Sequence, residues 1–378
     1  MKNTILKKSD SYINSITIWC FLFVIFVPNL VMPIVNSFFD LRMGVNEEKY
    51  EMPELKMDTI DGFSNDFDKW YSNNLPFRDV MGKEWAQFNY HILKDSANDG
   101  VLLGKNDKQN DSDRWLFYKN SDDFNPVKDV QGLTNYSQIE MGSMVAMMKK
   151  NTKAAAKHGF KLYYLVAPNK ESIYREYLPD SVFFYDDYSR MDKFFEYTKA
   201  VGVSNLFYPK EELMKAKDLG QIYYKQDTHW NELGAGVAFK EIIKTIKPEW
   251  HYDFDYDFEQ KKTEGDLAKM LKVPNYFTDQ MVVIKHKSGS GKYNYDDLGD
   301  ISISHNNSAP IGKKVLIVGD SFRTNISEFF YRTFSDCMLL HRRAYKPEML
   351  EEYDADVVIL EFVERYAPAI IDFALYAE

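Results

Sequence analysis

Short apolar runs alternate with longer amphipathic stretches along the second half of the chain. Apolar runs of this length, bounded by turn residues, predict buried strands, and the longer stretches predict helices. Strands covered by helices on both faces read as continuous apolar runs, so the pattern indicates a mainly parallel α/β sheet. The predicted strands are Lys161–Val166, Ser204–Tyr208, Lys314–Val318, Cys337–His341 and Asp356–Glu361. The predicted helices are Ser189–Val201, Asn231–Ile246, a helix from after Ser321 to about Phe334, and Pro347–Glu352.

The part of the chain before this alternation predicts other elements. A helix is expected from about residue 76 to 96, and another over Tyr136–Lys157. Two short apolar runs, Val101–Lys105 and Arg114–Tyr118, flank a polar stretch and predict a hairpin. Residues 251–312 interrupt the later rhythm because they are polar and hold one strand-like run, Met281–His286. They predict a surface insertion.

The N-terminal region contains an apolar segment, Ile16–Val35, without a charged residue. About 20 helical residues span the hydrocarbon core of a bilayer, so the segment predicts a transmembrane anchor. Lysines precede it, which places the N-terminus in the cytoplasm and the remainder outside. A cleaved signal peptide is the alternative, although the apolar run is longer than usual and no small-residue cleavage site follows it. The expected divisions are 1–15 cytoplasmic, 16–37 anchor, 38–75 neck and 76–378 extracellular catalytic domain.

Composition narrows the choice of partner. The formal net charge is −10, and residues 1–39 carry +2, which leaves −12 for the remainder. An acidic chain argues against a nucleic-acid partner, because such binding depends on basic side chains that neutralise phosphates. Aromatic residues make up 16% of the chain, which favours surfaces that stack on flat apolar faces such as sugar rings. Cys337 is the one cysteine after the anchor, so we expect no intrachain disulfide there.

A candidate nucleophile follows the predicted strand Lys314–Val318. The strand ends in Gly319-Asp320-Ser321 and a helix begins just after. Functional groups in open α/β sheets lie beyond the carboxyl ends of strands, where a serine can expose its hydroxyl. Its own backbone N–H can face a developing oxyanion. An Asp or Ser at this position is also an ordinary helix cap, so the pattern alone leaves both interpretations open.

A serine nucleophile needs a base and a group that orients the base. His229 stands two residues after Asp227, in a segment where Asn231 is suited to cap the next helix. A carboxylate two residues away can bind one imidazole nitrogen and support the imidazolium. The alternatives are a capping Asp beside a packed His, or a two-residue metal site. No further cluster has metal-ligand spacing, so we predict no metal site.

Three more residues are candidates for substrate binding. Arg343 follows the strand after Ser321, and Tyr366 follows the last strand, so both belong to the edge where strand ends converge. Trp230 adjoins His229 and offers a ring to a sugar. The alternatives are a salt-bridged surface arginine for Arg343 and packing beside the Asp–His pair for Trp230.

These segments together resemble a known family. Asp227-Thr228-His229-Trp230, followed by Val315–Phe322, is similar to the alginate O-acetyltransferase family of AlgJ and AlgX type, whose Gram-positive relatives are DHHW-motif proteins. The resemblance extends over roughly residues 60–370. It implies an SGNH-hydrolase-like three-layer α/β/α domain with permuted motif order. It also implies Ser321 as nucleophile, His229 as general base and Asp227 as orienting group, with no cofactor.

The resemblance and the topology together predict a membrane-anchored extracytoplasmic O-acetyltransferase of an exopolysaccharide. The resemblance further implies a membrane-bound O-acyltransferase partner that supplies acyl groups. Because the exterior is acidic, it opposes a polyanion such as alginate, and a neutral glycan such as cellulose, or a cell-wall polymer that carries cationic substituents, fits better. Alternatives are a carbohydrate acetylesterase with the same triad and a non-catalytic scaffold or glycan-binding subunit of a secretion complex. The acyl group itself, acetyl or D-alanyl, stays open.

Overall fold

The chain divides into two compact units, Met1–Lys94 and Asp95–Glu378. The computed structural model describes residues 15–20, 22–23, 26–27, 51–54, 60–74, 78–106, 110–119, 124–262, 264–273 and 275–376. The first unit contains helices α2 (Ile60–Asn74) and α3 (Arg78–Phe88) and a π-helical turn, η1 (Asn89–Leu93). Of the predicted anchor at 16–37, residues 16–20, 22–23 and 26–27 are described and are helical, whereas its other residues and much of the predicted neck lie outside the described residues. In the part that is described, no helix is both long and apolar enough to cross a membrane.

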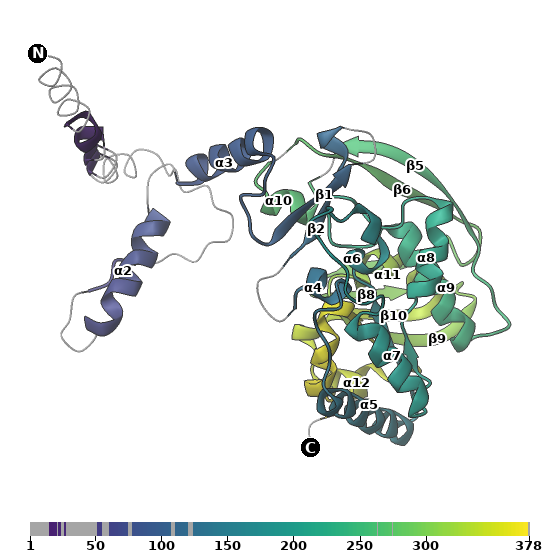
Figure 1. Cartoon of the computed structure of the whole chain (residues 1–378). Coiled ribbons are helices and arrows are strands. Elements are labelled where there is room, and N and C mark those ends of the chain that lie inside the picture. Colours follow the sequence, from purple (N-terminus) through teal and green to yellow (C-terminus); the bar gives the residue numbers. More distant parts are fainter. Residues whose placement is uncertain are drawn as a thin grey trace, which may run out of the picture. The chain divides into compact units, whose positions relative to one another are not determined.

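The second unit is built around a seven-stranded sheet (Figure 1). Its strands, in spatial order, are β4 (Leu206–Phe207), β3 (Lys161–Ala167), β11 (Val357–Val363), β9 (Ile311–Gly319), β10 (Phe334–His341), β8 (Ile301–His305) and β7 (Asn294–Asp297). Two further sheets are the hairpins β1 (Val101–Asn106) with β2 (Arg114–Tyr118), and β5 (Phe254–Lys262) with β6 (Thr278–His286).

The α-helices of this unit separate the strands. They are α4 (Pro126–Val130), α5 (Gln138–His158), α6 (Lys170–Ile173), α7 (Arg190–Ala200), α8 (Lys210–Ala216), α9 (Glu232–Ile246), α10 (Asp266–Met270), α11 (Arg323–Thr333) and α12 (Pro347–Tyr353). Short 3-10 helices are η2 (Asp111–Asp113), η3 (Arg175–Tyr177), η4 (Lys217–Leu219), η5 (Arg342–Ala344) and η6 (Glu364–Asp372).

The predicted mainly parallel sheet is confirmed. Strands β4, β3, β11, β9 and β10 run parallel to their neighbours, and β8 and β7 add antiparallel pairs at one edge. The predicted strand at 204–208 is shortened to two residues of β4 at the opposite edge. The parallel arrangement brings the carboxyl ends of β3, β11, β9 and β10 to one edge of the sheet, where functional groups of such folds lie.

Helices cover both faces of the sheet, and the alternation of side chains along β3 shows why. Tyr163 and Leu165 join one core with residues of α8, α9 and α11. Leu162 and Tyr164 join the other core with residues of α5, α7 and α12. Because successive strand residues point to opposite faces, an uninterrupted apolar strand supplies both cores at once. The result is the three-layer α/β/α arrangement that the sequence predicts.

The polar stretch 251–312 is more than a surface insertion. It contains β5, α10, β6, β7 and β8 and the first two residues of β9, and two of its strands extend the main sheet. All four residues of β7 are exposed and β8 has one buried residue, so these antiparallel edge strands lack the continuous apolar run that marks the parallel strands. That is the physical reason for which the sequence pattern shows them poorly.

Glu364 is a buried carboxyl that ties the ends of three elements together. It accepts hydrogen bonds from the backbone N–H of Asn169 (2.8 Å) and from the hydroxyls of Ser172 (2.8 Å) and Ser189 (3.1 Å). Burial raises the pKa of Glu364 to about 7. Protonation of this group is therefore linked to folding.

This linkage predicts a pH-dependent stability. Between pH 4.5 and about 7, folded Glu364 retains a proton that the unfolded chain has released, so the free energy of unfolding falls as pH rises through that window. The loss amounts to at most about 3 kcal/mol. Glu364→Gln imitates the protonated form. Urea unfolding at pH 5 and pH 8 should therefore show the variant gaining stability relative to the unmodified protein at pH 8. Equal pH dependence in both proteins would contradict this role.

Candidate active site

Ser321 lies at the carboxyl end of β9, in a tight turn before α11. Gly319 makes the turn possible, because a Cβ there would lie 2.3 Å from the Oε2 atom of Glu361. Glu361 Oε2 accepts the backbone N–H of Asp320 at 2.9 Å. Burial and the neighbouring Asp320 raise the pKa of the Glu361 carboxyl well above its usual range. A carboxyl whose ionisation is disfavoured is therefore packed beneath the turn.

Asp320 holds the turn in place from the other side. Its two oxygens accept the backbone N–H groups of Phe322 (3.0 Å) and Val363 (2.7 Å). The side chain thus joins the end of β11 to the residues around Ser321. The Ser321 side chain itself is exposed. A rigid turn with an exposed hydroxyl is the arrangement that a serine nucleophile requires.

The structure brings together the three residues that the sequence predicts to act as a unit. His229 Nε2 lies 2.7 Å from Ser321 Oγ, and His229 Nδ1 lies 2.5 Å from Asp227 Oδ1. A carboxylate only accepts hydrogen bonds, so Nδ1 carries the proton and Nε2 presents a lone pair to the serine hydroxyl. This tautomer is the one in which the imidazole can receive the serine proton.

Asp227 remains ionised although it is half-buried. Burial raises its pKa, but hydrogen bonds and the charge of the His229 partner outweigh burial and lower the pKa to about 2. Asp227 Oδ1 also accepts the backbone N–H of His229 (3.0 Å), and Oδ2 accepts the backbone N–H of Asp266 (2.9 Å). The carboxylate is thus fixed by three donors and stays available to support an imidazolium.

Asp266 at the start of α10 reaches the site through a close approach of two backbones. A Cβ on Gly265 would lie 2.3 Å from the carbonyl oxygen of Gln226 and 2.9 Å from Cβ of Asp227. The Asp266 side chain accepts the backbone N–H (2.8 Å) and the hydroxyl (2.5 Å) of Thr228. Sequence reasoning assigned no role to Asp266, because its contacts with Thr228 and Asp227 form only in the folded chain.

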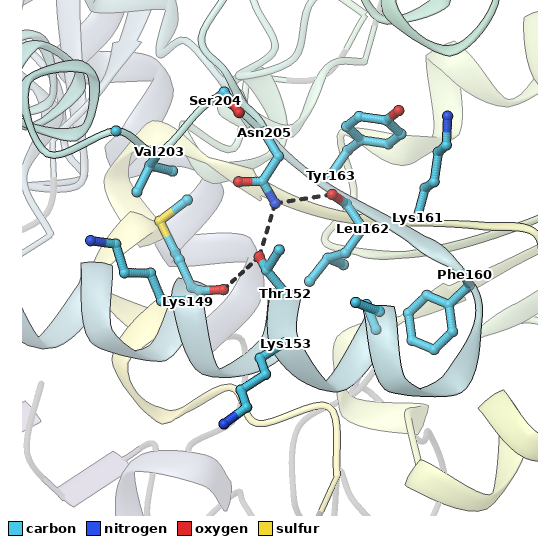
Figure 2. Close-up of a pocket in the computed structure, with 14 residues that line it drawn as sticks. Lys149, Thr152, Lys153, Phe160, Lys161, Leu162, Tyr163, Val203, Ser204 and Asn205 are labelled. Atoms are coloured by element: carbon cyan, nitrogen blue, oxygen red, sulfur yellow. Dashed lines mark hydrogen bonds between the residues drawn. The ribbon is translucent and has the colours of Figure 1, made fainter.

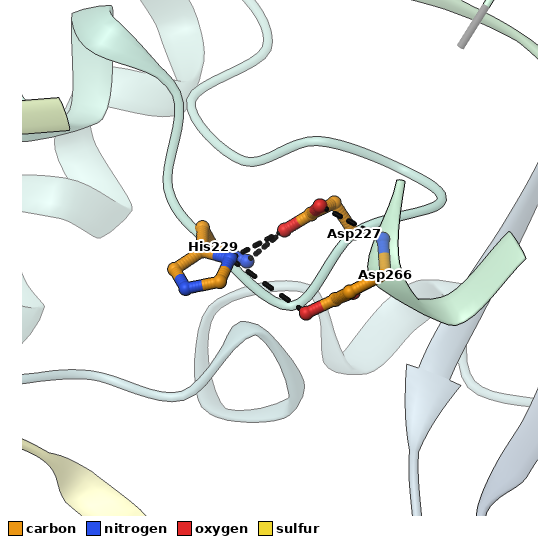
Figure 3. Close-up of side chains that lie close together, drawn as sticks. All are labelled: Asp227, His229 and Asp266. Atoms are coloured by element: carbon orange, nitrogen blue, oxygen red, sulfur yellow. Dashed lines mark hydrogen bonds and ion pairs between the residues drawn. The ribbon is translucent and has the colours of Figure 1, made fainter. Parts of the chain in front are cut away.

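Asp227, His229 and Asp266 also form a group that could hold a metal ion (Figure 3). Their ligand atoms lie within 4.8 Å of one another. The Nδ1–H of His229 already donates a hydrogen bond to Asp227, and the Asp266 oxygens already accept hydrogen bonds from Thr228. A cation at Nδ1 would displace the proton that orients the ring toward Ser321. The hydrogen-bond pattern therefore fits an acid–base unit better than a metal centre.

Trp230 fastens the His229 segment to the Ser321 turn. Its indole N–H donates to the carbonyl of Phe322 (3.0 Å), and the amide of Asn325 donates to the carbonyl of Trp230 (2.6 Å). The Trp230 side chain is completely buried, and its ring packs edge-on against Phe322. The structure therefore places this predicted sugar-binding residue in the core, behind the reactive groups.

Lys170, at the start of α6, supports the same segment from below. Its ammonium donates to the backbone carbonyls of Tyr224 (3.2 Å), Lys225 (2.9 Å) and Asp227 (2.7 Å). Burial lowers the pKa of Lys170 to about 8. Asn231 then caps α9 by accepting the N–H groups of Leu233 and Gly234, both at 3.1 Å. The cap that the sequence predicts is confirmed, and it fixes the chain two residues beyond His229.

The other two predicted substrate-binding residues lie apart from the triad contacts. Arg343 is exposed and forms a two-point ion pair with Asp300, at 2.7 and 2.6 Å. Tyr366 packs between the guanidinium groups of Arg342 and Arg365, whose central carbons lie 4.9 and 5.2 Å from its ring centre. Neither shows a contact with Ser321, His229 or Asp227 among the described residues.

A hollow of about 550 Å³ lies at the opposite edge of the sheet, beside the beginning of β3. Lys149, Lys153 and Lys161 line it, and Figure 2 shows their ammonium groups pointing in different directions. Ligand pockets have polar groups that converge on one point. The Ser321–His229–Asp227 group, and not this hollow, is therefore the candidate reactive centre.

Comparison with known proteins identifies the family. Residues 109–325, more than half of the chain, match the family described as "SGNH hydrolase-like domain, acetyltransferase AlgX". A protein of Pseudomonas syringae pv. tomato named "Probable alginate O-acetylase AlgJ" is 24% identical over 324 residues, which cover 79% of this chain and 77% of the relative.

Solved structures share the fold. PatB1 of Bacillus cereus superposes with a TM-score of 0.50 at 13% identity, over 71% of this chain and 97% of that one. A DHHW family protein from Eubacterium siraeum gives a TM-score of 0.50 at 16% identity, over 74% of this chain and 97% of that one. At these identities the likeness concerns the fold alone.

The close approach at Gly265 predicts a sensitive position. Gly265→Ala forces α10 away from Gln226 and removes the Asp266 N–H from Asp227, so we expect a loss of about 1–3 kcal/mol in the free energy of unfolding. The downfield proton NMR signal of His229 Nδ1–H should weaken as well. The control is Gly312→Ala, whose Cβ meets nothing within 4 Å. If both variants match the unmodified protein in stability and NMR signal, the approach at Gly265 is unimportant.

Proposed function

Because the chain belongs to the AlgX family of SGNH hydrolase-like acetyltransferases, we propose that it transfers acetyl groups to the hydroxyls of a polysaccharide through Ser321, His229 and Asp227. The observation that carries the proposal is the continuous hydrogen-bond path from Asp227 through His229 to Ser321 Oγ, with distances of 2.5 and 2.7 Å. The same arrangement of serine, imidazole and carboxylate serves acyl transfer on unrelated folds.

In the first half of the proposed reaction, Ser321 Oγ attacks the carbonyl carbon of an acetyl donor while His229 Nε2 takes the hydroxyl proton. Asp227 stabilises the imidazolium that forms. In this proposal, the backbone N–H of Ser321 stabilises the developing oxyanion. The tetrahedral intermediate then expels the donor's leaving group, which receives the proton from His229, and an acetyl-serine remains.

In the second half, a sugar hydroxyl gives its proton to His229 Nε2 and attacks the acetyl-serine. The new ester bond forms on the sugar, and the Ser321–acyl bond breaks. Ser321 Oγ recovers the proton from the imidazolium. The net reaction moves one acetyl group from donor to glycan, and the proposed route uses side chains without a cofactor.

The acceptor in this proposal is a neutral glycan. The relatives are named for alginate, a polyanion, whereas this chain carries a formal charge of −10. Like charges oppose association at low salt. The lysine-lined hollow of Figure 2 lies at the opposite edge of the sheet from Ser321, so it does not supply a basic path to the nucleophile. Both observations favour an uncharged acceptor such as cellulose.

We further propose that the catalytic unit is held outside the cell by the apolar segment Ile16–Val35. Acetyl-CoA is cytoplasmic, so an extracytoplasmic enzyme needs acetyl groups passed across the membrane. A membrane-bound O-acyltransferase is the class of partner that would supply them. Anchoring would raise the effective concentration of the two proteins around each other.

Substitution of the three residues tests the chemistry. With p-nitrophenyl acetate as donor, Ser321→Ala should remove the initial burst of p-nitrophenol, because no acyl-serine forms. Asp227→Asn disturbs the tautomer of His229 and should slow turnover by about 10³–10⁴-fold. Stopped-flow absorbance measures both effects.

The control for these variants is Ser143→Ala on α5, a helix that covers the opposite face of the sheet from α9 and α11. It should keep the burst and the turnover of the unmodified protein. A full burst in Ser321→Ala would remove the serine from the mechanism. It would favour the non-catalytic scaffold that the sequence leaves open.

The fate of the acetyl group separates a transferase from an esterase. The Ser321 side chain is exposed, so water has access to an acetyl-serine. We expect a neutral oligosaccharide to divert acetyl groups from acetate to sugar esters, with p-nitrophenol release rising as the acceptor concentration rises. Mass spectrometry of the oligosaccharide measures transfer. Free acetate as the sole product with every neutral acceptor would identify a carbohydrate acetylesterase.

A further inference from the structure

A cleft of about 300 Å³ lies along α11, the helix that begins two residues after Ser321. It lies between α11 and the outer strands β7 and β8 of the main sheet. Its floor includes Leu339 of β10 and Ser302 of β8, which are paired in the sheet near the carboxyl end of β10. The lining residues are Tyr293, Tyr295, Asp297, Gly299, Ser302, Arg323, Thr324, Ser327, Glu328, Tyr331 and Leu339.

The cleft begins next to the candidate nucleophile. Arg323 and Thr324 are the second and third residues after Ser321 and begin α11, and the backbone N–H of Thr324 donates to the carbonyl of Ser321 at 3.1 Å. Ser327 and Tyr331 continue the lining along the same helix. At 1.5 Å per helical residue, the lining from Thr324 to Tyr331 extends over about 10 Å. A chain-like acceptor that occupies the cleft can therefore place its next unit at Ser321.

Three tyrosine rings pack together in this cleft, and the Tyr293 ring is tilted by 46° to the other two. Tyr295 stacks on Tyr331 with ring centres 5.8 Å apart and planes 19° apart, and Tyr293 lies 6.2 and 5.7 Å from these two rings. Tyr331 is buried and donates its hydroxyl to Ser302 Oγ at 2.8 Å. Tyr295 remains 57% exposed, so one ring face is open to solvent. Packed rings with one open apolar face suit the flat C–H face of a pyranose sugar.

The polar groups around these rings are better suited to bind the hydroxyls of a ligand than charged groups on it. Thr324 and Ser327 supply hydroxyls along α11. The Arg323 guanidinium is held by the carbonyl of Asp320 at 2.7 Å. Glu328 is paired with Arg332 at 2.6 Å, which neutralises its charge. Arg323 and Asp297 both line the cleft and carry opposite charges, so the lining is close to electrically balanced, as a neutral sugar requires.

We propose that this tyrosine cleft is an acceptor subsite, which holds a neutral pyranose unit of the glycan beside the unit that receives the acetyl group. The inference rests on the proposed acetyltransferase function. It adds a binding role for Tyr293 and Tyr295 and a reason for the aromatic content of this region. The sugar ring stacks on Tyr295, and its hydroxyls bind the polar side chains of α11.

Direct binding tests the cleft independently of catalysis. The Ser321→Ala protein cannot form an acyl-serine, so calorimetric titration with cellohexaose and chitohexaose measures binding alone. We expect saturable binding of at least one of these neutral hexasaccharides, and about tenfold weaker binding when Tyr295→Ala is added. Tyr295→Phe retains the ring and should retain most of the affinity. The matched control is Tyr185→Ala, which removes another exposed tyrosine, one that lies outside the cleft lining.

Two results would overturn the subsite. One is the absence of saturable binding by either hexasaccharide, and the other is binding that Tyr295→Ala leaves unchanged. In the unmodified protein, Tyr295→Ala should raise the KM for the acceptor about tenfold while the p-nitrophenol burst stays intact. If the proposed function is wrong but the subsite is right, the hexasaccharide still binds in a way that depends on Tyr295, and no acetyl transfer to it is detected.

Discussion

The candidate active site depends on Trp230, which holds the loop of His229 against the turn of Ser321. Its indole N–H binds the carbonyl of Phe322, and its own carbonyl accepts the amide of Asn325. Trp230 directly follows His229, and Phe322 directly follows Ser321. These two buried contacts thus hold the imidazole against the hydroxyl, across 92 residues of sequence. A site built this way is organised before any ligand arrives, which lowers the cost of reaching the transition state.

Buried polar groups hold each loop in turn, and each forms hydrogen bonds with backbone atoms. Lys170 donates to the carbonyls of the loop before His229, and Asp320 accepts N–H groups around Ser321. Glu361 supports the same turn through the N–H of Asp320. Removing one partner from such a network leaves a buried polar group without its hydrogen bond, which costs about 1–3 kcal/mol. The geometry of the reactive residues is therefore coupled to the stability of the fold.

The sequence predicts the parallel core and the reactive residues because both have local signals. Lys314–Val318 is an apolar run before Gly319-Asp320-Ser321, and Asp227 stands two residues before His229. Asp266 has no such signal, because its contact depends on the close approach of Gly265 to Gln226. Trp230 is aromatic in the sequence whether it binds a sugar or fills the core, and only the packing assigns it to the core. Strands β7 and β8 also lack a local signal, because these edge strands have no continuous apolar run.

Trapping the acyl-enzyme tests the central claim most directly. The full chain is mixed with p-nitrophenyl acetate, quenched in acid during the burst and digested, and the acetylated peptide is sequenced by mass spectrometry. The account predicts one acetyl group on Ser321, which disappears when a neutral oligosaccharide is added before quenching. An acetyl group on another residue, or an acetyl-serine that no oligosaccharide discharges faster than water does, would contradict it.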